Sequence, residues 1–111
     1  MKPVLRRAQS RLDVEAASDF YEAEAGPAVA ERLLAAVQQT HEAIGRHPRA
    51  GSTRFGRDTG VAGLRSRRVP RFPYLVFYVE LPDAVEVWRV LHDKSDIPHQ
   101  LREGSGAPPG E

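Results

Sequence analysis

The spacing of apolar residues changes once along this chain, near Gly63, and that change restricts the fold more than any other feature. Before Gly63 the apolar residues recur at helical intervals, whereas after it they alternate or form the continuous runs typical of strands. With 111 residues the chain has room for one domain. The order of the two patterns predicts a single α+β domain in which helices come first and a sheet follows.

Two consecutive amphipathic helices are expected in the first half of the chain. In the first helix, Leu12, Ala16 and Phe20 recur every four residues with Ala17 and Tyr21 beside them, so we expect one apolar stripe that packs this helix on the sheet. A second helix is expected over residues 28–44, after a glycine–proline break that favours a new helix start. The short joint between the two helices predicts an antiparallel helical hairpin.

The second half is expected to form strands joined by turns. The apolar run of residues 74–79 is typical of a central strand that is covered on both faces. An arginine-bearing strand before it and a valine-rich strand after it complete a three-stranded antiparallel meander. In chain order, we expect a first strand over 4–7, a loop over 49–63, strands over 64–69, 74–79 and 84–91, and a helical turn over 96–101.

Composition restricts the class of protein and the kinds of site that it can carry. Residues 103–111 are rich in glycine and proline and lack an apolar anchor, so we expect a folded domain over 1–102 followed by a disordered tail. The absence of cysteine excludes disulfides and thiolate metal sites, and the scattered histidines lack metal-ligand spacing. We therefore expect no cofactor and no metal. Because no signal-peptide core and no run of roughly 18 apolar residues occurs, we expect a soluble cytoplasmic protein.

Charge is unevenly distributed, although the net charge is only +1. Six arginines lie between Arg54 and Arg71 against a single acid, Asp58, while the first helical region is acidic. This polarity suits an acidic partner, although a solvated basic face has the same pattern. The near-neutral total argues against a dedicated DNA-binding protein, so no direct specific DNA binding is expected. The candidate target- or phosphate-binding residues are Arg65, Arg67, Arg71 and Arg89.

Two segments carry a resemblance to a known family. Residues 63–78 read GLRSRRVPRFPYLVFY, and residues 89–98 read RVLHDKSDIP. In combination they resemble the RelE/ParE superfamily of toxins from type II toxin–antitoxin systems, and they are closer to the ParE, plasmid-stabilisation branch. The resemblance covers about residues 4–101 and implies a RelE/ParE-like fold. It also implies a toxin that causes growth arrest and is neutralised by a cognate, ParD-like antitoxin.

The two branches of the superfamily need different residues. RelE-type members cleave messenger RNA on the ribosome, which requires a proton acceptor, a proton donor and cations for the phosphorane. Arg65 and Arg67 align with basic positions on the corresponding RelE strand. However, the neighbour of Tyr74 is Leu75 where RelE-type enzymes tend to carry arginine, and no tyrosine follows in the C-terminal segment.

His92 is the best catalytic candidate, because imidazole exchanges protons near neutral pH and the residue ends the last expected strand. The alternative is a structural histidine that holds the C-terminal turn, for example through Asp96. ParE-type members inhibit DNA gyrase through protein contact, which needs exposed arginine or aromatic anchors such as Trp88 rather than an acid–base pair. We therefore predict a gyrase inhibitor that acts by contact, and a ribosome-dependent endoribonuclease of RelE type is the alternative.

Overall fold

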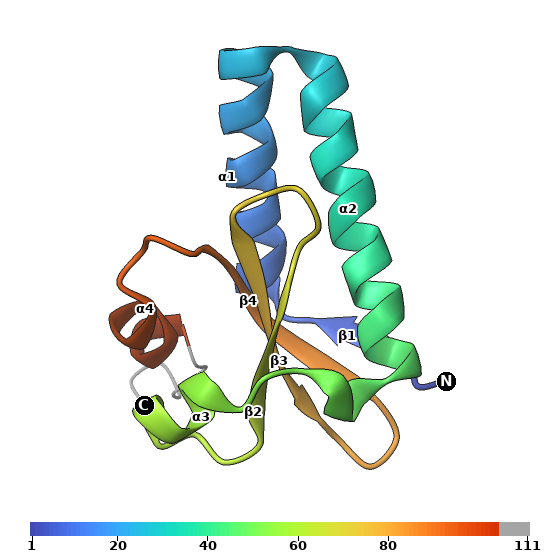
Figure 1. The fold of residues 1–111 in the computed structure, drawn as a ribbon, viewed down its shortest axis with the longest axis vertical. Helices are drawn as coiled ribbons and strands as arrows, with labels where there is room; N and C mark the ends of the chain where they lie inside the picture. Colours follow the sequence, from blue (N-terminus) through green and yellow to red (C-terminus); the bar gives the residue numbers. More distant parts are fainter. Residues whose placement is uncertain (105–111) are drawn as a thin grey trace.

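The computed structural model describes residues 1–104 and shows a four-stranded mixed sheet with helices on both faces (Figure 1). The strand order is β1-β4-β3-β2, in which β1 pairs parallel with β4 and the other pairs are antiparallel. The predicted α+β architecture of a strand, a helical hairpin and a meander is confirmed. The elements are β1 (Val4–Arg6), α1 (Ala8–Ala25), α2 (Pro27–Arg46), η1 (Pro48–Ala50), α3 (Arg54–Thr59), β2 (Leu64–Arg68), β3 (Tyr74–Glu80), β4 (Val85–His92) and α4 (Ile97–Gly104).

Two apolar cores lie on opposite faces of the sheet. The hairpin of α1 and α2 covers one face, where Leu33 and Ile44 pack against strand residues such as Val76. The short helices α3 and α4 cover the other face, where Leu101 packs with Phe77. Since Val76 and Phe77 are both fully buried and point to opposite faces, the prediction of a central strand covered on both sides is confirmed.

The predicted apolar stripe of α1 is wrong in part. Leu12 and Phe20 are 55% and 56% exposed, whereas Val14, Ala17 and Tyr21 pack against the core. The reason is that Asp13 points toward the sheet, where it is paired with a strand arginine, and this turns the stripe of Leu12 and Phe20 toward solvent. The helix therefore buries a mixed polar and apolar face that the periodicity of its large residues does not reveal.

The segment 49–63, which we expected to be a loop, contains η1 and the short helix α3, so that prediction is wrong in part. Gly56 explains how α3 packs closely on the sheet, since a Cβ there would lie 2.7 Å from the carbonyl oxygen of Leu64. The expected C-terminal helical turn is α4, which reaches Gly104 and so extends two residues into the predicted tail. Residues 105–111, the remainder of that predicted tail, lie outside the described residues.

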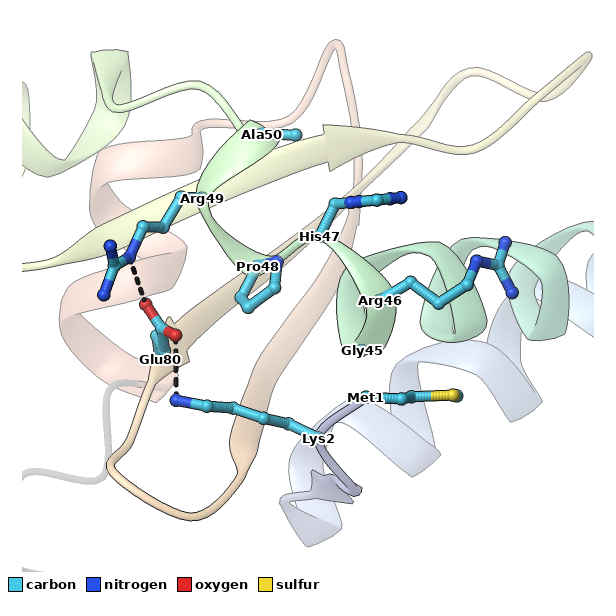
Figure 2. Close-up of a pocket in the computed structure, with 9 residues that line it drawn as sticks. All are labelled: Met1, Lys2, Gly45, Arg46, His47, Pro48, Arg49, Ala50 and Glu80. Carbon is cyan, nitrogen blue, oxygen red and sulfur yellow. Dashed lines mark hydrogen bonds and ion pairs between the residues drawn. The ribbon is translucent and has the colours of Figure 1, made fainter.

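An ion-pair triad attaches the N-terminal segment to the sheet (Figure 2). Lys2 and Arg49 converge on Glu80 at the end of β3, with nitrogen–oxygen distances of 2.8 and 3.2 Å. These two cations lower the pKa of the Glu80 carboxyl below its usual value. The backbone at Lys2 passes close to the end of α2. A Cβ on Gly45 would lie only 2.8 Å from the Lys2 carbonyl oxygen. The glycine and the triad together bring β1 to the edge of the sheet beside β4.

Candidate functional site

Arg65 and Arg67 project from the same face of β2, as strand alternation predicts. Arg65 lies opposite Tyr78 in the sheet and donates to the Gly51 carbonyl oxygen at 2.9 Å. Arg67 is half-buried, and its side chain makes no hydrogen bond or ion pair with any residue among 1–104. Burial raises the pKa of the Tyr78 phenol above its usual value. The positive charges of Arg65 and Arg67 lower this pKa, but their effect is smaller than that of burial. Two cations without carboxylate partners therefore lie side by side on this strand.

Further basic groups surround η1, next to these two arginines. Arg46, His47 and Arg49 line an open pocket of about 530 Å³ at the end of α2. Figure 2 shows Arg49 directed at Glu80, whereas the side chains of Arg46 and His47 point away from that carboxylate. Sequence reasoning missed this group, because nothing in the spacing of these residues indicates that η1 lies against β2. The contact depends on the Ser52–Ser66 bridge, which joins two segments far apart in the chain.

Arg71 occupies the tip of the β2–β3 connection. Its φ is +69°, the left-handed region that residues other than glycine seldom adopt. The side chain is exposed and lines a pocket of about 320 Å³ together with Phe72 and residues of α2. A strained backbone that presents an exposed arginine is typical of a position under functional constraint.

Arg89 is not part of this exposed group. The side chain is 6% exposed and forms a bidentate pair with Asp13, with Nε at 2.8 Å and Nη2 at 2.9 Å from the two carboxylate oxygens. Its Nη1 donates to the Gln100 carbonyl oxygen at 2.9 Å. Since every side of the guanidinium is engaged inside the protein, Arg89 links α1, β4 and α4 and is unable to act as a surface anchor.

Trp88 is only partly accessible. The indole Nε1 donates to Glu86 at 3.0 Å, and the Arg7 guanidinium carbon lies 4.0 Å from the ring centroid. The ring also packs against the core formed with α3 and α4. Trp88 thus covers the core on the side of α3 and α4. It is therefore only in part the exposed anchor that the sequence suggested.

His92 ends β4 and is held within a turn. Its Nδ1 accepts a hydrogen bond from the Lys94 backbone N–H at 3.0 Å, so the neutral ring carries its proton on Nε2. The ring packs edge-on against Tyr74, with 5.3 Å between the centroids. Tyr74 and Tyr78 are four residues apart on β3, so His92 lies roughly 13 Å along the strand from the position of Arg65. The structure therefore separates His92 from Arg65, whereas Arg68 of the same strand pairs at 2.7 Å with Asp93, which lies beside His92.

A second exposed surface lies on α1. Leu12, Ala16 and Phe20 form an apolar stripe that reaches a shallow groove of about 290 Å³ beside His92 and Ser95. The joined ends of α1 and α2 extend beyond the sheet (Figure 1). Phe20, in the second half of α1, is 56% exposed. Exposed acids border the stripe on the same helix, at Glu15 and Asp19. An exposed apolar stripe flanked by acids is a surface suited to a protein partner.

The described part of the chain holds neither a candidate metal cluster nor a helix that could span a membrane. Within residues 1–104 no three histidine, aspartate or glutamate side chains cluster in a way that could hold a metal ion. None of the helices in that part of the chain has the length and apolar character needed to cross a membrane.

Comparison with known proteins identifies the family. Residues 4–97 match the family model described as the ParE toxin of the type II toxin–antitoxin system, parDE. Among solved structures, the chain is similar to the chromosomal ParDE toxin–antitoxin system from P. aeruginosa, with a TM-score of 0.69 and 18% identity over 83% of this chain and 96% of that one. No curated protein gives a significant match. The family match covers most of the chain and agrees with the fold, so the chain belongs to the ParE toxin family of type II toxin–antitoxin systems.

Proposed function

We propose that this toxin inhibits DNA gyrase by direct protein contact through an arginine surface formed by Arg65, Arg67 and Arg71. The observation that carries the proposal is that these guanidinium groups lie at the surface without a carboxylate partner among residues 1–104. Each can present a planar fork of donors to carboxylates of a partner protein. Arginine is also the charged residue most often found as an anchor in protein interfaces.

The geometry around His92 favours contact over RNA cleavage. A general acid–base pair must lie within hydrogen-bond reach of the same reacting group as the phosphate-binding cations. Here His92 uses Nδ1 to hold its own turn, and Arg65 lies further along the sheet. Leu75, in the place of an arginine beside Tyr74, points into the core on the α4 side. Inhibition by protein contact requires neither an acid–base pair nor phosphate-binding cations beside it.

Replacing residues of the arginine surface is expected to abolish growth arrest without unfolding the toxin. The Arg65→Ala/Arg67→Ala double variant should bind its target at least ~10-fold more weakly, since each anchor contributes roughly 1 kcal/mol or more. Arg71→Gly removes a guanidinium and relieves the left-handed backbone, so its melting temperature should equal or exceed that of wild type. Growth on induction and thermal melting are the two measurements.

Arg54→Ala is the matched control, because Arg54 is an exposed arginine at the start of α3, outside the pockets that Arg65 and Arg71 line. It should remain toxic. If the arginine-surface variants stay toxic, or if they melt far below wild type, the site assignment is wrong.

We further propose that the cognate antitoxin neutralises the toxin by laying an amphipathic helix along the stripe of Leu12, Ala16 and Phe20. The shallow groove beside the stripe gives such a helix a second surface to pack against. Because Glu15 and Asp19 border the stripe, the antitoxin helix should carry apolar residues flanked by lysine or arginine. The ParE family implies a cognate antitoxin, and we propose that it covers this solvent-exposed apolar surface.

The Leu12→Ser/Phe20→Ser variant is expected to escape neutralisation. Both side chains are more than half exposed, so the folded toxin should melt within a few degrees of wild type. Loss of two apolar anchors should weaken antitoxin binding by about 100-fold or more, as measured by titration calorimetry with the purified antitoxin. Ala62→Ser, at an exposed apolar residue just before β2 and outside both proposed antitoxin contacts, is the control and should bind normally. Equal affinity of the stripe variant and wild type would place the antitoxin elsewhere.

A further inference from the structure

A further pocket lies where β1, α1 and α2 meet, away from the arginine surface and from the exposed stripe. Its volume is about 370 Å³, within the roughly 300–1,000 Å³ range of ligand pockets. Val14 and Val37 form apolar walls, and Leu34 is 43% exposed at the rim. His41 also lines the pocket and is only 5% exposed. We call this cavity the β1 pocket.

Two kinds of polar group in the β1 pocket, a buried ring nitrogen and two guanidinium groups, lack a partner among the described residues. The buried Nε2 of His41 has no hydrogen-bond partner among residues 1–104. Arg6 and Arg11, both exposed, line the same pocket and form no ion pair with any residue of that range. A buried polar atom without a partner is uncommon in native proteins and calls for a specific explanation. A polar ligand group that enters beside two arginines provides one.

The edge of β1 beside the pocket is open. The Pro3 carbonyl and the Arg7 N–H bond to β4, so strand alternation directs the backbone groups of Val4 and Arg6 away from the sheet. The opposite edge of the sheet differs, because Ser52 bridges to Ser66 on β2. Unpaired backbone donors and acceptors on an edge strand are a template for an additional strand. The chain therefore presents open backbone, an apolar pocket and two cations at one place.

We propose that the β1 pocket binds an aliphatic side chain and an adjoining carboxylate of the antitoxin, presented by an extended segment that pairs with the open edge of β1. This inference rests on the proposed neutralisation by an antitoxin, and it adds a contact separate from the α1 stripe. The aliphatic group packs on Val14, Leu34 and Val37, and the carboxylate pairs with Arg6 and Arg11. One oxygen of that carboxylate accepts the hydrogen bond that His41 Nε2 lacks.

The two antitoxin contacts are expected to differ in secondary structure and in charge. The segment on the α1 stripe should be helical and basic, whereas the segment in the β1 pocket should be extended and acidic. Main-chain pairing supplies affinity in such strand additions, and alternate side chains that enter pockets supply specificity. Charge complementarity at Arg6 and Arg11 should speed association and make it sensitive to salt.

The test measures binding of purified antitoxin to toxin variants at low and high salt. The Arg6→Glu/Arg11→Glu variant is expected to bind at least ~10-fold more weakly than wild type at low salt, with a smaller loss of affinity on adding salt. The Arg32→Glu/Arg57→Glu variant is the control, since it changes net charge equally at exposed arginines outside the pocket. It should retain wild-type affinity within a factor of about three.

Hydrogen exchange on the wild-type complex gives a second measurement that needs no variant. The amides of Val4 and Arg6 should exchange at least ~10-fold more slowly in the complex than in the free toxin, because the proposed strand accepts their hydrogen bonds. If no complex forms with wild-type toxin, the proposed neutralisation itself fails. If the complex forms, but both amides exchange as before and the Arg6→Glu/Arg11→Glu variant binds like the control, only the β1-pocket inference is overturned.

Discussion

The Asp13→Ala variant is expected to lose about 3–5 kcal/mol of its free energy of unfolding, because it leaves the buried guanidinium of Arg89 without its counter-charge. Asp13 also accepts the Val90 backbone N–H at 2.9 Å, so the substitution removes a backbone hydrogen bond as well. A small domain is typically stable by only about 5–15 kcal/mol. Urea unfolding at pH 7 should show a variant close to the limit of folding.

A double variant separates the ion pair from packing. Asp13→Leu/Arg89→Leu removes both charges together and should be much less destabilised than either single leucine variant, since no buried charge is left alone. Asp19→Ala is the control: this acid lies on the same helix but is exposed, and its loss should change stability by no more than about 0.5 kcal/mol. If Asp13→Ala unfolds at the urea concentration of wild type, the structural role of Arg89 is contradicted.

Stability is expected to fall by about 2 kcal/mol between pH 7 and pH 5 on account of His41. Burial, and secondarily the Arg6 charge, lower the pKa of His41 from 6.5 to about 4. The unfolded chain therefore takes up a proton below pH 6.5 that the folded chain takes up only near pH 4, and this favours unfolding throughout that window. The urea midpoint measured at several pH values should follow this curve.

His41→Leu should flatten the curve, because an apolar residue has no proton to bind and leaves no unpaired nitrogen in the buried site. His47→Leu, at an exposed histidine, should leave the curve as steep as in wild type. The carboxyls of Glu80 and Asp93 also have lowered pKa values, so the stability that they contribute is lost only below the ordinary carboxyl range. A wild-type protein equally stable at pH 7 and pH 5 would show that the His41 ring is not held neutral.

The regular elements were predictable from sequence because their periodicity reflects local burial. Residues 74–79 are apolar on both faces because both faces are covered, and the helical spacing over 28–44 points Leu33, Val37 and Ile44 at the sheet. The antiparallel meander was predictable because the connections between its strands are short. The parallel pairing of β1 with β4 was not predictable, since it joins the first strand to the last.

The orientation of α1 and the position of Arg89 have one common cause. Asp13 and Arg89 are 76 positions apart, and neither residue type indicates burial unless the partner is known. Reading Leu12 and Phe20 as core is therefore the natural inference from α1 alone, and reading Arg89 as a surface anchor follows from β4 alone. In contrast, Arg65 and Arg67 were placed on one face by strand alternation, which depends only on near neighbours.

The most direct test of the proposed function is to add the purified toxin to a gyrase supercoiling reaction and, separately, to a translating ribosome extract. We expect loss of supercoiling with wild-type toxin, restoration of supercoiling when antitoxin is added, and little inhibition by the Arg65→Ala/Arg67→Ala variant. Messenger RNA in the extract should remain intact. A supercoiling reaction that proceeds normally, together with messenger RNA cut at defined codons and protected by His92→Gln, would contradict inhibition by contact and identify a ribosome-dependent endoribonuclease instead.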